Sequence, residues 1–202
     1  MAKVKLTKTE LKAQTDALKR FQRFLPMLQL KKQQLQSEIA GIVAKAEAVS
    51  ARERAVRDGL NKWVGLIATD EPALDGLVTV KKINMGKANI AGVDIPTFSS
   101  VDTDVREIDA WATPAWVDDA VEVTTQILSL QCERQVYEEQ RRLVTEELRQ
   151  TSQRVNLFEK VKIPQCKEAI RVIKIALGDE QTAAVTRGKI AKSRVPESEV
   201  AA

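Results

Sequence analysis

The sequence predicts a mainly α-helical fold: a long antiparallel two-helix coiled coil formed by the N- and C-terminal helices, with a short central β-hairpin or small α/β insertion at the loop end. Apolar residues recur with heptad spacing near both ends of the chain. The 202 residues are 30% charged and only 4% aromatic, which is typical of a long helical protein. Between the heptad segments, about fifty residues change to a β-type pattern.

Four regions follow from these patterns. Residues 1–64 are expected to form the N-terminal coiled-coil helix, and residues 65–112 the central segment with its hairpin. Residues 113–178 are expected to form the C-terminal coiled-coil helix. Residues 179–202 are polar and lysine-rich and lose the heptad pattern, so they are expected to be a basic, flexible tail.

The N-terminal helix has apolar residues at thirteen of its sixteen a and d positions from Leu11 to Trp63. Thr7 followed by Glu10 forms a capping box at its start. Pro26 lies inside the helix, where proline costs about 3 kcal/mol unless a kink is tolerated. The predicted seam consists of Leu18, Phe21, Leu28, Leu35, Ile39 and Ile42, and in the C-terminal helix of Leu148, Val155, Ile163 and Ile170.

The C-terminal helix changes heptad phase within its second half. Its seam runs to Phe158 and resumes at Ile163, one residue out of phase, beside Pro164. Proline cannot donate the helical hydrogen bond, so a bend or loosened turn is expected there. Antiparallel pairing of the two seams sets together positions whose numbers sum to roughly 177, which places Lys32 opposite Glu146.

The central segment has β-branched residues and partial alternation. Residues 77–83 and 90–96 are expected to be strands, with 84–89 between them, and residues 99–109 a loop or weak helix. A two-stranded hairpin is marginal alone, so we expect it to rest on the coil or on another protein of a complex.

Catalytic signatures are missing from the sequence. It contains no histidine, and Gly86-Lys87 lacks the first glycine and the hydroxyl of a phosphate-binding loop. The carboxylates of Asp102, Asp104 and Asp109 lack the spacing of a calcium loop. We therefore expect no catalytic residue, no metal and no cofactor, and no enzyme activity by the chain itself. No apolar run is long enough for a membrane span or signal peptide, and the two cysteines, Cys132 and Cys166, lie too far apart to bridge within one helix.

Charge is distributed unevenly. Residues 1–32 carry nine Lys and Arg against two Asp and Glu, or +7, and residues 154–194 carry ten against four, or +6. An antiparallel coil would bring both stretches to its open end. Three interpretations compete: nucleic-acid binding, which lacks a recognition motif or stacking platform; simple solvation of exposed helix faces; and insertion into an acidic sleeve of partner proteins.

Specific residues extend the interpretation. The run Thr151-Ser-Gln-Arg-Val-Asn156, followed by Ile163-Pro164, resembles the C-terminal signature of the D subunits of V-type and archaeal-type rotary ATPases. Leu28-Gln-Leu-Lys-Lys-Gln-Gln-Leu35 resembles the family's N-terminal basic helix motif, and Asn89-Ile-Ala-Gly-Val-Asp-Ile-Pro96 is similar to its central segment.

This resemblance implies a central rotor shaft, which transmits rotation between a ring that hydrolyses or synthesises ATP and the membrane ring that translocates ions. Implied partners are the catalytic and regulatory subunits of the ATPase ring, the smaller F subunit, which clasps the shaft, and a funnel-shaped subunit at its base. No nucleic acid and no direct membrane insertion are implied, and the location is cytoplasmic, peripheral to the membrane. The alternative is an antiparallel coiled-coil scaffold or tether without rotary function. We assign contacts with the ring to Arg20, Arg23, Lys160, Lys162 and Lys167, all in the basic stretches.

Overall fold

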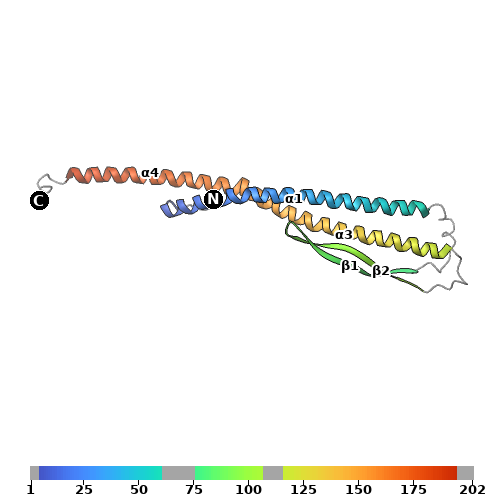
Figure 1. The fold of residues 1–202 in the computed structure, drawn as a ribbon. Coiled ribbons are helices and arrows are strands. Elements are labelled where there is room, and N and C mark those ends of the chain that lie inside the picture. The colour runs from blue at the N-terminus through green and yellow to red at the C-terminus, as the bar shows by residue number, and fades with distance from the viewer. Residues whose placement is uncertain (1–4, 61–75, 107–115, 195–202) are drawn as a thin grey trace. The chain divides into compact units, whose positions relative to one another are not determined.

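The structure, a computed structural model, describes residues 5–60, 76–106 and 116–194 (Figure 1). Along the chain the elements are α1 (Lys8–Leu60), β1 (Val78–Ile90), β2 (Val93–Val105), α3 (Trp116–Asn156), the π-helical turn η1 (Leu157–Lys162) and α4 (Ile163–Arg194). The predicted fold of two long helical segments around a β-hairpin is confirmed. The region boundaries predicted at 64/65 and 112/113 lie outside the described residues.

The chain divides into two compact units, and each contains parts of both terminal helical segments. Unit 1 combines Met1–Leu30 with Thr151–Ala202, and unit 2 is Lys31–Gln150. In unit 2, Lys31 of α1 contacts Glu147 of α3, and Arg52 contacts Glu133. Residue numbers rise along α1 as they fall along α3, so the two helices are antiparallel there.

The start of α1 shows the N-cap half of the predicted capping box, whereas the Glu10 side chain accepts from Gln14 Nε2. The backbone N–H of Glu10 donates to Thr7 Oγ1 at 3.2 Å, which satisfies one of the donors that a helix leaves free at its first turn. Pro26 lies inside α1, and the helix continues through it to Leu60. The apolar packing on both sides of Pro26 therefore offsets the cost of the hydrogen bond that proline cannot make.

The core of unit 2 joins both helices and the hairpin. Leu35 and Ile42 of α1, Val144 of α3 and Ile95 of β2 are almost completely buried in one cluster. The partly buried residues packed against this cluster come from the hairpin and both helices: Ile39, Ala88, Ile90, Ala91, Val93, Tyr137 and Leu148. The hairpin therefore rests on the coil, where it gains the buried area that two strands alone lack.

The predicted placement of Lys32 opposite Glu146 differs from the observed ion pair by one residue on each side. Lys31 Nζ lies 2.7 Å from Glu147 Oε1, whereas Glu146 pairs with Arg149 on its own helix at 2.7 Å. The pairing offset is close to the prediction, since the numbers of Lys31 and Glu147 sum to 178. Heptad positions alone fix the seam but not which flanking residue reaches across it.

The hairpin is longer than predicted, and its turn lies elsewhere. Asn84–Asn89, expected to separate the strands, belongs to β1, and residues 99–105, expected to be a loop or weak helix, belong to β2. The turn is at Ala91 and Gly92, whose φ angles are +50° and +83°. Two positive φ values match the right-handed twist of a hairpin. The side chain of Asn89 supports the turn by accepting from Gly92 N–H and donating to Asp94.

The predicted phase change in the C-terminal segment is confirmed and has a defined structure. The backbone N–H of Ile163 donates to Phe158 O, five residues earlier, and residues 157–162 form a π-helical turn. A π turn accommodates one residue more than an α turn. The shifted seam is the one that is buried: Cys166 and Ile173 are 6% and 0% exposed, whereas Gln165 is exposed.

The helix α4 continues to Arg194, beyond the predicted end at 178. The flexible tail expected from 179 is therefore wrong for residues 179–194, which are helical. All of these residues are exposed, which agrees with their loss of the heptad pattern. Good helix formers such as Ala183 and Ala184 favour the helix without a buried face. None of the described helices is long and apolar enough to cross a membrane.

Candidate partner-binding surfaces

The residues assigned to ring contacts all belong to unit 1 and are all exposed. Arg20 and Arg23 lie on α1, Lys160 and Lys162 in η1, and Lys167 on α4. Residues 5–30 and 151–194 together carry sixteen Lys and Arg against six Asp and Glu. Unit 1 therefore presents exposed positive charge that suits an acidic partner.

Exposed apolar side chains accompany this charge on α1. Phe24, Met27 and Leu30 are 47%, 61% and 57% exposed. With Arg20 and Arg23 they follow helical spacings of three and four residues, so these five residues share one side of the helix. We call them the α1 outer face. Sequence reasoning assigned its charges but missed its apolar residues, although a phenylalanine and a methionine outside the heptad seam were a readable signal.

The seam beside this face is half-buried on α1 and buried at two positions of α3. Phe21 of α1 and Phe158 of η1 are in contact, with ring centroids 5.0 Å apart and planes tilted by 51°, a favourable aromatic geometry. Val155 is 5% exposed, and Thr151 is 1% exposed with its hydroxyl lacking a hydrogen-bond partner. None of the ten residues predicted for the seam is exposed. The basic and apolar residues of the α1 outer face therefore lie on a helix whose other side packs on the C-terminal helical segment through Phe21.

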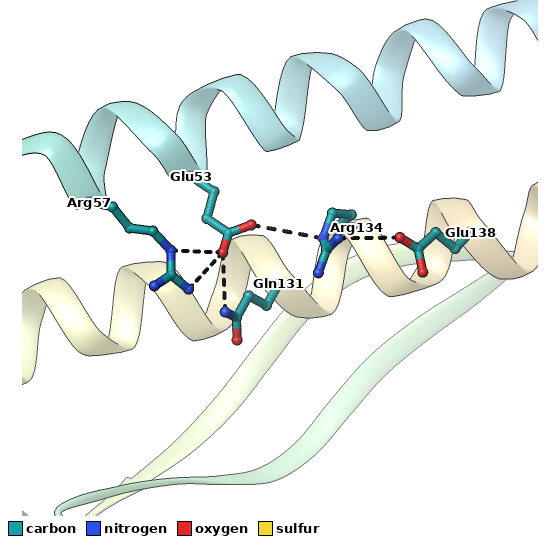
Figure 2. Close-up of polar contacts among 5 residues, drawn as sticks. All are labelled: Glu53, Arg57, Gln131, Arg134 and Glu138. Atoms are coloured by element: carbon teal, nitrogen blue, oxygen red, sulfur yellow. Dashed lines mark hydrogen bonds and ion pairs between the residues drawn. The ribbon is translucent and has the colours of Figure 1, made fainter.

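Unit 2 contains a polar layer between the helices (Figure 2). Glu53 of α1 occupies a heptad a position, and its Oε1 accepts hydrogen bonds from Gln131 at 3.1 Å and from Arg57 at 2.9 Å. Its Oε2 lies 3.8 Å from Nε of Arg134, which also pairs with Glu138 at 3.5 Å. In the sequence, Glu53 and Arg134 are polar residues that interrupt the apolar seams of the two helical segments. An acidic residue in one seam and a basic residue at the facing position of the other seam indicate that the two side chains pair.

The polar layer keeps Glu53 ionised. Hydrogen bonds from Gln131 and then Arg57 lower the pKa of the Glu53 carboxyl, while burial opposes them. The Glu53 side chain is only 12% exposed, whereas those of Arg57 and Arg134 are 50% and 40% exposed. A half-buried carboxylate with partners on both helices stabilises one alignment of α1 on α3.

Beside this layer lies a groove of about 170 Å³ between α1 and α3. Its lining includes Glu47 and Glu138 together with Arg134 and Arg141. Because acidic and basic side chains balance, the groove does not select a charged ligand. Within the part of the chain that the structure describes, no cluster of three or more His, Cys, Asp or Glu residues is arranged to hold a metal ion.

The geometry of the described residues defines a class of protein: a helical coiled coil with an inserted β-hairpin, whose distinctive surfaces are suited to protein partners. The family model for the D subunits of ATP synthases matches residues 10–193. The chain belongs to this family of ATP synthase D subunits.

Three curated relatives, each named as the D subunit of a V-type ATP synthase, illustrate this similarity. The chain is 44% identical over 193 residues to the protein of Borreliella burgdorferi, covering 96% of this chain and 95% of the relative. It is 32% identical over 199 residues to that of Chlamydia muridarum, with 96% and 97% covered. It is 30% identical over 196 residues to that of Chlamydia felis, with 96% and 94% covered.

Proposed function

We propose that the chain is the central rotor shaft of a V/A-type ATPase. In this role it transmits rotation between the ring that hydrolyses or synthesises ATP and the membrane ring that translocates ions. The observation that carries the proposal is the family match over residues 10–193, which includes both terminal helical segments and the hairpin. The heptad seams and polar layer support it, because a shaft requires stiffness along its length.

The shaft acts mechanically and has no catalytic residue of its own. An asymmetric surface that turns inside a ring makes different contacts with each member of the ring, and differential contact energy is what shifts the affinity of otherwise similar sites. In unit 1, Arg20, Arg23, Lys160, Lys162 and Lys167 are the proposed contacts with acidic loops of the catalytic and regulatory subunits. The apolar residues of the α1 outer face supply the uncharged part of the contact.

Other surfaces serve the remaining partners. The F subunit is proposed to bind unit 2 along the coil and the hairpin segment 77–96, where exposed Met85 and Val80 accompany Lys81. A funnel-shaped subunit is proposed to connect the base of the shaft to the membrane ring. The complex places the chain in the cytoplasm, peripheral to the membrane.

A charge-reversal experiment tests the ring contacts. The variant R23E/K160E/K162E changes three exposed unit 1 cations, and K45E/R54E/R141E makes the same charge change at exposed positions of unit 2. At roughly 0.2–1 kcal/mol per exposed charge contact, the unit 1 variant should bind the purified ring about three- to a hundredfold more weakly, with a shallower salt dependence. Binding is measured by native gel titration and by ATP hydrolysis of the ring.

The outcomes separate the proposal from its rival. The unit 2 control should assemble as the wild type does. Equal assembly of both variants would remove the assignment of the ring contacts to unit 1. If the wild-type chain neither assembles with an ATPase ring nor co-purifies with one from native membranes, the coiled-coil scaffold replaces the rotor shaft.

A further inference from the structure

The π-helical turn η1 contains one residue more than a regular α-helix requires. Phe158 and Ile163 are five positions apart, whereas heptad neighbours are three or four apart. The hydrogen bond from Ile163 N–H to Phe158 O spans this surplus. Each residue of an α-helix turns the chain by about 100°, so the surplus decides which side of α4 meets α1 in unit 1.

Two apolar stripes lie side by side on α4. In the structure the inward stripe contains Ile163, Cys166, Ile170, Ile173 and Leu177, all buried or half-buried. A regular α-helix continuing from Phe158 would instead turn inward Lys162, Gln165, Ala169, Val172 and Ala176. The second stripe begins with two polar residues but is apolar from Ala169 on. In the structure Ala169 of this stripe is already buried and Ala176 is half-buried, whereas Val172 is 39% exposed.

The turn itself is weakly held. None of its six residues is buried. Pro164, directly after it, has no N–H to donate to the preceding turn, so one helical hydrogen bond cannot form in either arrangement. The contact of Phe158 with Phe21 is the aromatic contact that ties the turn to α1. Few buried contacts and an absent hydrogen bond are the properties of a locally unstable segment.

We propose that η1 is a rotational joint, at which α4 exchanges between the observed π turn and a less populated regular α turn that brings the second apolar stripe toward α1. The surplus residue, stored in the π turn, permits the exchange without breaking the chain's helical path. If the chain is the rotor shaft proposed above, the joint lets the part of the shaft in unit 1 rotate while its helices stay paired. The exchange itself does not depend on that function.

The thiol of Cys166 reports the exchange directly. Cys166 is 6% exposed, and burial raises the pKa of its thiol while Lys162 opposes the rise. In the regular α turn Gln165 takes its place, and the thiol becomes accessible to an alkylating reagent. Labelling is measured on the full chain carrying C132A, because Cys132 is also a free cysteine. Rates are divided by those in denaturant, which removes differences in intrinsic reactivity.

Deletion of Glu159 removes the surplus residue and leaves the inward stripe in phase with Phe158. In the deletion variant a regular α-helix already turns the inward stripe, including Cys166, toward α1. Labelling of Cys166 should therefore slow about tenfold or more. Deletion of Glu180 is the matched control: it removes the same residue type from the exposed part of α4, and labelling should not change. Equal rates in the wild type and the Glu159 deletion would overturn the proposal, provided that far-ultraviolet circular dichroism shows both to be helical.

A second variant keeps the proposal testable if the deletion does not fold. K162L/Q165L makes the second stripe apolar along its whole length and favours the regular α turn. Labelling of Cys166 should then be about tenfold faster than in the C132A background. Unchanged labelling in K162L/Q165L would contradict the joint, whatever the deletion does and whether or not the chain assembles with an ATPase.

Discussion

Replacing Glu53 with glutamine tests whether the polar layer stabilises unit 2. Glutamine keeps the shape but loses the charge that three partners contact within 3.8 Å: Gln131, Arg57 and Arg134. Hydrogen bonds to charged groups contribute about 1.5–3 kcal/mol, and the exposure of both arginines screens part of this. We expect E53Q to lower the free energy of unfolding by about 1–2 kcal/mol at pH 7.

The pH dependence of this difference gives a second test. The folded-state pKa of Glu53 is lowered from its ordinary 4.5, so its stabilisation is fully present above the unfolded pKa and is lost as pH falls through the folded pKa. The difference between wild type and E53Q should therefore be constant from neutral pH to about pH 5 and shrink below about 4.5. Other carboxyls titrate equally in both proteins and cancel.

Urea unfolding of the isolated chain at several pH values measures the effect. E38Q is the matched control, since Glu38 is an exposed residue of α1, and its change should stay within about 0.5 kcal/mol. A destabilisation of E53Q no larger than that of E38Q at pH 7 would refute a stabilising role of the layer. A difference that persists unchanged at low pH would refute the electrostatic cause.

Two further predictions concern packing and the hairpin turn. L35A should lower the free energy of unfolding by about 2–5 kcal/mol in urea titrations, because Leu35 is 0% exposed in the cluster joining α1, α3 and β2. L30A, at an exposed position, is its control. Equal losses of stability in the two variants would contradict the assigned core. G92A should lower the free energy of unfolding by about 1 kcal/mol, because φ of Gly92 is +83°. G41A, within α1 and free of close contacts, should be neutral or stabilising. A lower thermal unfolding temperature for G41A than for G92A would contradict the turn geometry.

The helical part of the fold could be predicted because its signal is periodic. The heptads of α1, the capping contact of Thr7 and the phase change beside Pro164 all follow from local spacing, and each has its counterpart in the structure. The phase change could be predicted because one extra residue between Phe158 and Ile163 visibly breaks the three-and-four spacing of the apolar seam. Sequence spacing was sufficient for features that depend on residues within a few helical turns of one another.

The hairpin and the polar contacts depend on tertiary neighbours, and sequence alone did not fix them. Asn84–Asn89 contains turn-forming residues, yet pairing along the whole of β1 with β2 overrides them and moves the turn to Ala91 and Gly92. Gly86 is not part of a turn; its lack of a side chain allows close strand pairing, because a Cβ there would lie 2.6 Å from Thr97 Oγ1 on the facing strand. The buried Gln140 donates to Pro96 O at 2.6 Å, a bond between α3 and β2 that no spacing rule predicts.

Among the proposed surface contacts, those of unit 1 were assigned from charge alone, and charge does not identify an interface. The structure adds Phe24, Met27 and Leu30, whose exposure on the side of α1 that carries Arg20 and Arg23 gives the proposed contact an apolar centre. A surface that combines exposed apolar side chains with arginine is typical of a protein–protein interface.

Rotation of the chain inside an ATPase ring tests the central proposal most directly. The ring is assembled with a C132A/C166A chain carrying S99C, at an exposed position of β2 outside the segment assigned to the F subunit, and a small bead is attached there while the ring is held on a surface. The rotor-shaft proposal predicts that ATP drives the bead round in one direction, at a rate that follows ATP hydrolysis. A ring that contains the chain and hydrolyses ATP while the bead stays fixed or only fluctuates would contradict it.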